Sequence, residues 1–194
     1  MQRIWTAVIP VKGTEQAKSR LFADSSLARA IHLDTILATL TSNPVRRVVV
    51  VTTAQWADDS LSGLDLTVVV DPARGLDAAI HAGIEAAGTG PVAVLLGDLP
   101  ALDPLELEAV LAAAESMGRA FVPDREGSGT VLITSTTDHA PAFGEGSAQR
   151  HRDAGYVEID VPADSGLRRD VDTPEQLESL RGRLGKSTTV ATGD

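Results

Sequence analysis

The sequence predicts an α/β fold in which helices lie on both faces of a mostly parallel, twisted, doubly wound sheet. Short aliphatic runs alternate with helical patterns along the chain, and this alternation is typical of βαβ units. The length of 194 residues fits one domain with its own core. Because 43% of the residues are hydrophobic and only 3% are aromatic, Ala, Val, Leu and Ile must build that core.

Strands are expected where the chain has short continuous aliphatic or β-branched runs, which suit a sheet that is covered on both faces. These runs occupy residues 4–11, 48–52, 66–70, 92–96, 120–123, 130–134 and 156–161. The fifth and sixth runs flank a glycine-rich turn. Ligands of such sheets bind beyond the carboxyl ends of the strands, so the loops after the strands are the candidate functional segments.

Helices are expected where apolar residues recur every three or four positions. Such patterns cover residues 33–40, 54–61, 76–87 and 103–117. Asp103-Pro104 and Thr173-Pro174 each place an N-cap residue before a proline, so a helix begins at each of these pairs.

We expect residues 1–185 to form the domain and the small, polar residues 186–194 to be a disordered tail. The chain has 27 Asp and Glu against 17 Lys and Arg, a net charge of −10, which argues against binding to nucleic acids or anionic membranes. The absence of cysteine excludes disulfides and thiolate metal sites. Without an export signal or a membrane-spanning run, the expected location is cytoplasmic and the expected partners are small molecules.

A cationic loop follows the first strand. Lys12, Lys18 and Arg20 lie within nine residues of an otherwise acidic chain, and cations in this place suit a polyphosphate. The alternative is a solvated loop with scattered charges. The segment is neither a P-loop nor a dinucleotide-binding fingerprint, because the required glycine spacing is missing.

Carboxylates follow later strands. Asp98 comes directly after the fourth strand and is a candidate ligand for Mg²⁺, which takes one or two carboxylates together with phosphate oxygens. Asp170 and Asp172 are two residues apart and would point the same way in an extended segment, so they could join Asp98. The alternatives are that Asp98 caps a turn and that Asp172 supports the cap at Thr173.

Three further loops could contact a ligand. Arg74-Gly75 precedes a helix N-terminus, Thr130 follows the glycine-rich turn, and Gly144 begins a Gly-x-Gly-Ser segment that could form an anion nest with Ser147 as N-cap. Each segment could also be an ordinary turn. His151 lies one turn further along, and a single histidine of this kind is more often structural than catalytic.

The order of these motifs resembles one family, the guanylyltransferases of coenzyme F-420 biosynthesis that act on 2-phospho-L-lactate or phosphoenolpyruvate. The resemblance covers about residues 4–180. It rests on six motifs: Pro10-Val11-Lys12 with Ala17-Lys18-Ser19-Arg20-Leu21, Ala73-Arg74-Gly75-Leu76, Gly97-Asp98-Leu99-Pro100, Asp124-Arg125 with Gly127, Gly129 and Thr130, Phe143-Gly144 with Gly146, Ser147 and His151, and Asp170-Val171-Asp172-Thr173-Pro174.

The resemblance implies a single-domain nucleotidyltransferase-type fold, GT-A-like and Rossmann-like, that joins GMP from GTP to a phospho-acid and releases diphosphate. It also implies the site residues. Nucleotide binding falls to Lys12, Lys18, Ser19, Arg20, Arg74 and Gly75; catalysis to Lys12, Lys18, Arg20 and Asp98; acid binding to Thr130, Gly144 and Ser147; and Mg²⁺ binding to Asp98, Asp170 and Asp172.

The acceptor is expected to be phosphoenolpyruvate, because the Ala-, Arg- and Asp-rich composition looks actinobacterial and the family's actinobacterial members use that acid. The alternatives are 2-phospho-L-lactate, 3-phospho-D-glycerate, or a molybdopterin or sugar phosphate. Val131 and Asp77 stand where many members have Asn, so either residue could alter a pocket. An alternative of another class is a non-catalytic protein that binds GTP or a partner.

Overall fold

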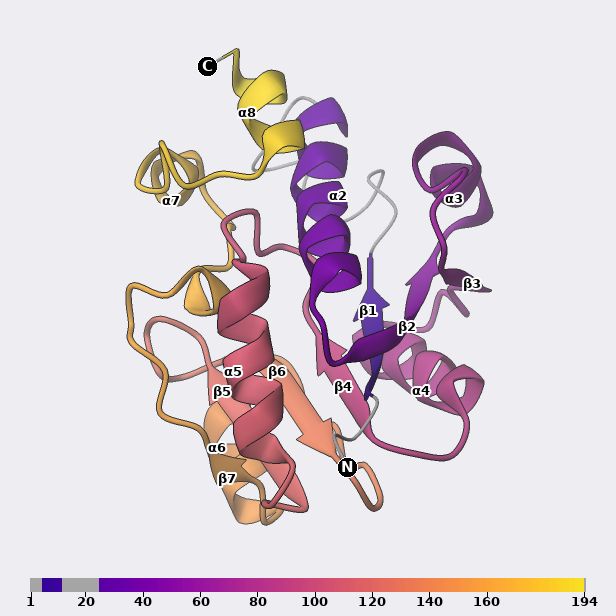
Figure 1. Ribbon diagram of the computed structural model, residues 1–194, viewed down its shortest axis with the longest axis vertical. Helices are drawn as coiled ribbons and strands as arrows, with labels where there is room; N and C mark the ends of the chain where they lie inside the picture. Colours follow the sequence, from indigo (N-terminus) through magenta and orange to yellow (C-terminus); the bar gives the residue numbers. More distant parts are fainter. Residues whose placement is uncertain (1–4, 12–24, 194) are drawn as a thin grey trace.

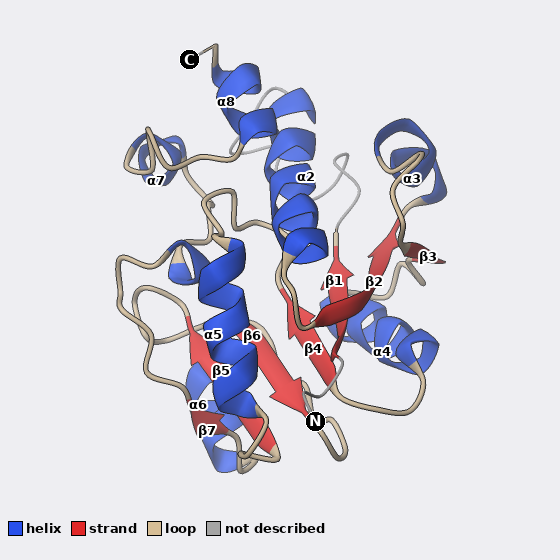
Figure 2. Cartoon of the chain, in the orientation of Figure 1, coloured by secondary structure: helices blue, strands red, loops and turns tan. Residues whose placement is uncertain are grey.

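The computed structural model describes residues 5–11 and 25–193. A seven-stranded sheet forms the centre of this part of the chain (Figures 1 and 2). The spatial order of the strands is β3-β2-β1-β4-β6-β5-β7. In chain order they are β1 (Trp5–Pro10), β2 (Val45–Thr52), β3 (Thr67–Val70), β4 (Val92–Leu95), β5 (Arg119–Pro123), β6 (Thr130–Ser135) and β7 (Val157–Glu158). The last strand is shorter than the predicted 156–161.

The helices largely follow the predicted patterns. They are α2 (Ser25–Thr41), α3 (Ala54–Ser60), α4 (Leu76–Ala87), α5 (Pro104–Ala114), α6 (Ser147–Asp153), α7 (Pro174–Glu178) and α8 (Lys186–Thr192), with a 3-10 turn, η1, at Gly166–Arg168. Asp103 and Thr173 cap α5 and α7 as predicted, and Gln176 completes a capping box on α7. Within the described residues, no helix has both the length and the apolarity needed to span a bilayer.

The strand directions confirm the mostly parallel sheet. β1 pairs in parallel with β2 and β4, and β2 pairs in parallel with β3. β6 runs antiparallel to both of its neighbours, β4 and β5. The carboxyl ends of β1 to β5 and the beginning of β6 therefore meet at one edge of the sheet, which we call the carboxyl edge.

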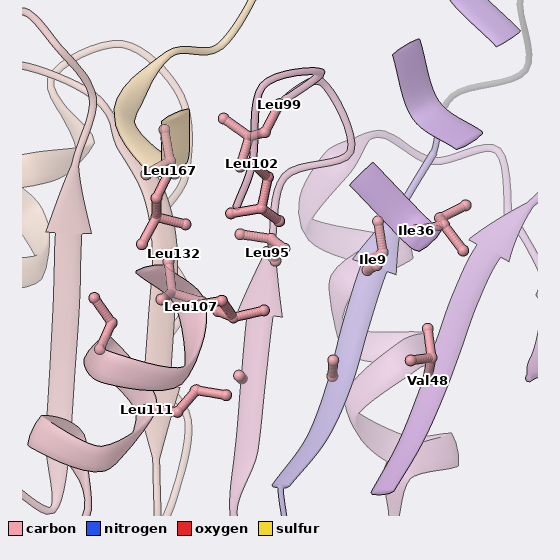
Figure 3. Packing of buried hydrophobic residues seen from close by; sticks show 14 of the residues in the cluster. Ile9, Ile36, Val48, Leu95, Leu99, Leu102, Leu107, Leu111, Leu132 and Leu167 are labelled. Carbon is pink, nitrogen blue, oxygen red and sulfur yellow. The ribbon is translucent and has the colours of Figure 1, made fainter. Parts of the chain in front are cut away.

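The helices cover both faces of the sheet, as predicted. On one face, Ile36 of α2 and Leu107 of α5 pack in the same buried cluster as Ile9 and Leu95 of the sheet (Figure 3). On the other face, α4 and α6 pack over a second cluster. α4 approaches the sheet closely at Gly83, where a Cβ atom would collide with valine side chains of β1 and β2.

The prediction of a disordered tail at 186–194 is wrong for residues 186–192, which form α8 beside α2 (Figure 1). Asp34 of α2 is buried, and its carboxylate accepts hydrogen bonds from the backbone N–H groups of Ser187 (2.9 Å) and Thr188 (2.7 Å). Gly185 N–H also donates to Pro100 O (2.8 Å). The polar composition of the tail hid this cap, because the capping carboxylate lies more than 150 residues away in the chain.

Candidate functional site

The loop after β4 is fixed by hydrogen bonds from α2. The ring nitrogen Nδ1 of His32 lies 2.6 Å from Gly97 O, and Leu99 N–H donates to Thr35 Oγ1 (3.0 Å). These two contacts hold the backbone on either side of Asp98. No sequence pattern predicts these contacts, because α2 begins about 70 residues before this loop and its polar positions look like ordinary helix surface.

Gly97 is required by close packing at the carboxyl edge. A Cβ atom there would lie 3.0 Å from Val11 Cγ2 and 3.2 Å from Pro10 O, tighter than ordinary side-chain contacts. Leu99 and Leu102 anchor the loop from the other side, because both are buried against the core (Figure 3). The backbone around Asp98 is thus rigidly placed where β4 ends.

The segment that carries Asp170 and Asp172 runs beside Asp98. Val171 N–H donates to Asp98 O (3.0 Å), and the Val171 side chain is fully buried with Ile31 in a cluster between α2 and α7. The segment that carries the later acidic pair is therefore hydrogen-bonded to the backbone of Asp98. Asp172 is exposed, and its N–H donates to Gln176 as part of the start of α7.

Burial and neighbouring negative charges raise the pKa of Asp170 to about 7. Burial is the largest cause, followed by the charges of Asp98, Asp172 and Asp124. The negative charge of Asp170 is thus opposed by three other carboxyl groups near the carboxyl edge. A bound cation would relieve this repulsion, and carboxylate oxygens are ligands that Mg²⁺ prefers.

These carboxylates do not form a complete metal site by themselves. Among residues 5–11 and 25–193, no three His, Asp or Glu side chains are placed to hold a metal ion. The expected cluster of Asp98, Asp170 and Asp172 is therefore not preformed. The donor set still fits Mg²⁺ with two protein carboxylates, because this ion usually completes its shell with phosphate oxygens and water.

Arg168 ties the acidic segment to the turn between β5 and β6. Its guanidinium donates to Asp124 O through Nε (3.1 Å) and Nη2 (2.6 Å), and to Val161 O through Nη1 (2.7 Å). The Asp124 carboxylate in turn accepts from the N–H groups of Ser128 (2.9 Å) and Gly129 (2.8 Å). The sequence does not predict the role of Arg168, because its partner Asp124 lies more than forty residues away. It does not predict the role of Asp124, because the contacts of that carboxylate depend on the exact geometry of the turn.

Thr130 opens β6 at the same edge and contacts α6. Its Oγ1 lies 2.9 Å from Nδ1 of His151, and Ala148 N–H donates to Ser128 O (3.1 Å). The start of β6, with Thr130, and the start of α6, with Ser147, are therefore neighbouring segments. The strand that Thr130 opens lies next to the loop of Asp98, since Leu96 N–H donates to Val131 O (2.9 Å).

Two expectations about the Gly144 segment need correction. The N-cap of α6 is Gly146, in the left-handed region at φ 70°, so Ser147 is the first helical residue and not the cap. The N–H groups of Ser147 and Ala148 donate to Gly144 O and Ser128 O, so these amides are used within the protein. The Ser147 hydroxyl is buried and has no hydrogen-bond partner among the described residues.

Arg150 organises the segment before α6. Its guanidinium donates to the carbonyls of Ala142 (3.0 and 3.1 Å), Phe143 (3.0 Å) and Glu145 (2.5 Å). Gly144 has φ 108°, a conformation that favours glycine, within this clamped loop. Val131, in contrast, is fully buried in the hydrophobic core, so its side chain does not form a pocket wall as the sequence had suggested.

The remaining predicted residues lie at two other places. Arg74 and Gly75 are exposed in the turn between β3 and α4, where Gly75 is the N-cap at φ 94°, and Asp77 is exposed in the first turn of α4. Ala73 N–H donates to Asp71 Oδ1 (2.8 Å) and shapes this turn. The cationic loop lies outside the described residues; it contains Lys12, Lys18, Ser19 and Arg20.

Comparison with known proteins identifies the domain. Residues 25–156 match the family model of the MobA-like NTP transferase domain. A nucleotidyl transferase from Methanothermobacter has the same fold, with a TM-score of 0.67 and 22% identity over 92% of this chain and 96% of that one. A 4-diphosphocytidyl-2C-methyl-D-erythritol synthase from Anaerococcus prevotii gives a TM-score of 0.61 with 10% identity over 98% and 97%.

Curated relatives are more similar in sequence. A phosphoenolpyruvate guanylyltransferase of Geodermatophilus obscurus is 45% identical, covering 98% of this chain and 95% of the relative. One from Streptomyces coelicolor is also 45% identical, covering 90% and 89%. The match extends over nearly the whole of both chains. The chain therefore belongs to the phosphoenolpyruvate guanylyltransferase family, whose fold is the MobA-like NTP transferase domain, and it is a nucleotidyltransferase.

Proposed function

We propose that the enzyme transfers GMP from GTP to phosphoenolpyruvate, giving enolpyruvoyl-diphospho-5′-guanosine and diphosphate, as a step of coenzyme F-420 biosynthesis. The observation that supports this proposal is the hydrogen bond from Val171 N–H to Asp98 O, which joins the Asp170 segment to the end of β4, next to the strand that Thr130 opens. Carboxylates that repel one another beside buried hydroxyls suit a reaction between two phosphates with a divalent cation. The names of the curated relatives support the same substrates.

The chemistry needs positioning and charge neutralisation more than a general base. The phosphate of phosphoenolpyruvate is largely ionised near neutral pH and is itself the nucleophile. One of its oxygens attacks the α-phosphorus of GTP, and the bond from that phosphorus to the bridging oxygen of the leaving diphosphate breaks. Lys12, Lys18 and Arg20 would bind the triphosphate and stabilise the charge of the leaving group, with Ser19 beside them.

Asp98 and Asp170 would hold Mg²⁺ together with phosphate oxygens. When bound, this ion would neutralise charge that develops on the α-phosphate. The role of Asp98 depends on its rigid backbone, which α2 holds through His32 and Thr35. Asp172 is exposed and would contribute mainly by its charge.

The phospho-acid would bind near Thr130, Gly144 and Ser147. Thr130 and Ser147 have buried hydroxyls, and the left-handed Gly144 allows a ligand to approach the backbone closely. A buried hydroxyl without a partner, such as that of Ser147, is an unsatisfied donor that an anionic oxygen would satisfy. Arg74 and Gly75 would contact the nucleotide from the start of α4, whose N-terminus favours anions.

The test is a competition between acids. Equal concentrations of phosphoenolpyruvate, 2-phospho-L-lactate and 3-phospho-D-glycerate are incubated with GTP, Mg²⁺ and enzyme, and the products are separated by mass. The first two acids share a phosphate and a carboxylate and differ in shape at one carbon. We expect the phosphoenolpyruvate adduct to predominate over the lactyl adduct by about 10- to 200-fold. A predominant lactyl adduct would overturn the choice of acid, and diphosphate release with none of the acids would overturn the reaction.

A further inference from the structure

His151 lies in a closed aromatic environment with both ring nitrogens engaged. Its side chain is fully buried, and its ring centroid lies 5.9, 5.3 and 5.2 Å from those of Phe121, Phe143 and Tyr156. Ala142 N–H donates to Nε2 (3.0 Å), and Nδ1 lies 2.9 Å from Thr130 Oγ1. The ring therefore cannot turn without breaking one of these contacts.

The contact with Ala142 determines the tautomer. A backbone N–H can only donate, so the nitrogen that faces it, Nε2, must be the bare acceptor. A neutral imidazole then carries its hydrogen on Nδ1 and donates it to Thr130 Oγ1. Burial and the nearby charge of Arg150 lower the pKa of His151 to about 4, which keeps the ring neutral near pH 7.

This tautomer limits what the Thr130 hydroxyl can do. Nδ1 cannot accept while it carries a hydrogen, so the hydroxyl hydrogen of Thr130 has to point elsewhere. Among the described residues, the contact with His151 is the one hydrogen bond of Thr130 Oγ1. The hydroxyl hydrogen is consequently available to an acceptor other than His151.

We propose that His151 is a positioning residue that presets the Thr130 hydroxyl as a hydrogen-bond donor to an anionic oxygen of the phospho-acid. This inference rests on the proposed function, because it takes the phospho-acid as the group that Thr130 meets. It explains why a fully buried histidine is placed behind Thr130: a histidine in the opposite tautomer would accept from the hydroxyl and leave it with lone pairs that repel an anion.

Two substitutions separate the two ring nitrogens. His151→Asn places its amide at the level of Nδ1 and can still donate to Thr130, but it loses the acceptor for Ala142. His151→Gln reaches the level of Nε2 and can still accept from Ala142, but it loses the donor to Thr130. We expect His151→Gln to raise the KM for the phospho-acid about 10- to 100-fold with the KM for GTP unchanged, and His151→Asn to restore most of this loss.

Thr130→Val and Tyr156→Phe complete the set. Thr130→Val should raise the KM for the acid as much as His151→Gln does. The double variant should have nearly the same KM as either single variant, because both changes remove the same hydrogen bond from Thr130 to the acid. Tyr156→Phe is the matched control: it removes the hydroxyl that accepts from Ala140 N–H (2.9 Å) in the same loop but leaves the Thr130 contact intact. Its KM for the acid should stay near that of the wild type.

A second measurement does not depend on turnover. Nitrogen-15 NMR of the wild-type histidines should show the hydrogen of His151 on Nδ1 at pH 7, and a hydrogen on Nε2 would overturn the proposal. Greater damage from His151→Asn than from His151→Gln would also overturn it, because that pattern means that the histidine only supports the Ala142 loop. If the wild type makes no adduct with any acid, the proposed function fails together with this inference. If it does, an equal loss in both variants removes this inference alone.

Discussion

Asp170 and His151 are both shielded from water near the carboxyl edge, yet their surroundings differ. Asp170 faces other carboxyl groups, and burial with their charges raises its pKa to about 7. His151 has a partner at each ring nitrogen, and burial lowers its pKa to about 4. Binding of a cation or a proton would relieve the repulsion on Asp170. Both ring nitrogens of His151, in contrast, have hydrogen-bond partners without any ligand. The carboxylate region around Asp170 thus carries charge that a bound cation would neutralise, whereas the ring contacts of the His151 region are already formed within the protein.

The largest expected effect is a loss of activity when the charge of Asp98 is removed. Asp98→Asn should lower the rate of diphosphate release by at least 100-fold, since losing a metal ligand costs several kcal/mol of transition-state stabilisation, on the order of 3 or more. The fold should remain, because the hydrogen bonds from His32 to Gly97 O and from Val171 N–H to Asp98 O hold the backbone of this loop and are kept in the variant. Diphosphate release and the melting temperature are both measured. A rate near that of the wild type would refute the metal role.

The protein should lose stability at low pH because His151 is kept neutral in the folded state. The unfolded state takes up a proton near pH 6.5 and the folded state only near pH 4, so the unfolded state binds more protons between these values. The free energy of unfolding should fall by about 3 kcal/mol as the pH drops through this window. Urea unfolding at pH 7 and pH 4.5 checks this. His151→Asn should be less sensitive to the same change, and an equal loss in wild type and variant would exclude His151 as the cause.

Asp170 should make the free energy of unfolding depend on pH in the opposite direction. Its folded pKa of about 7 lies above the unfolded value near 3.9, so the folded state binds more protons in between and stability falls as the pH rises. With EDTA at pH 8, Asp170→Asn should therefore stabilise the protein by about 1–2 kcal/mol, since partial access of water weakens the repulsion. At pH 4 the gain should vanish. A destabilised variant at pH 8 would mean that the carboxylate has a favourable partner instead.

The smallest effect concerns a carboxylate outside both regions. Asp34→Ala removes the cap of α8 and should lower the free energy of unfolding by about 1 kcal/mol, a typical value for a lost cap. Asp59→Ala is the control, because Asp59 pairs with Arg29 only at the surface (3.7 Å) and should change stability by less than about 0.5 kcal/mol. Equal effects of the two substitutions would show that α8 does not depend on its cap.

Local patterns predicted much of the fold. The β-branched run before Thr52 is a strand because it is covered on both faces, and Thr173-Pro174 begins a helix because the cap and the proline act within four residues. The position of Asp98 in the loop after a strand could be predicted for the same reason, because β4 ends three residues before it. The missed features depend on distant contacts, as with His32 behind Gly97.

The tail and the region around His151 show the same limit. Nothing in the residues around α8 indicates that a buried Asp34 will cap it. The spacing from Ser147 to His151 predicts that both lie on one side of a helix, but not that His151 will reach back to Thr130. Side chains that position other side chains leave no local pattern, because their partners are chosen by the closed fold.

The pairing of α8 with α2 has a kinetic consequence. Its hydrogen bonds join residues 153 and 154 positions apart, so forming them early would require closing almost the entire chain into a loop. They should form after the sheet has assembled and be absent from the folding transition state. Substitutions at Asp34 should then speed unfolding while leaving the folding rate nearly unchanged. The contact therefore slows the unfolding of the folded domain without helping it to fold.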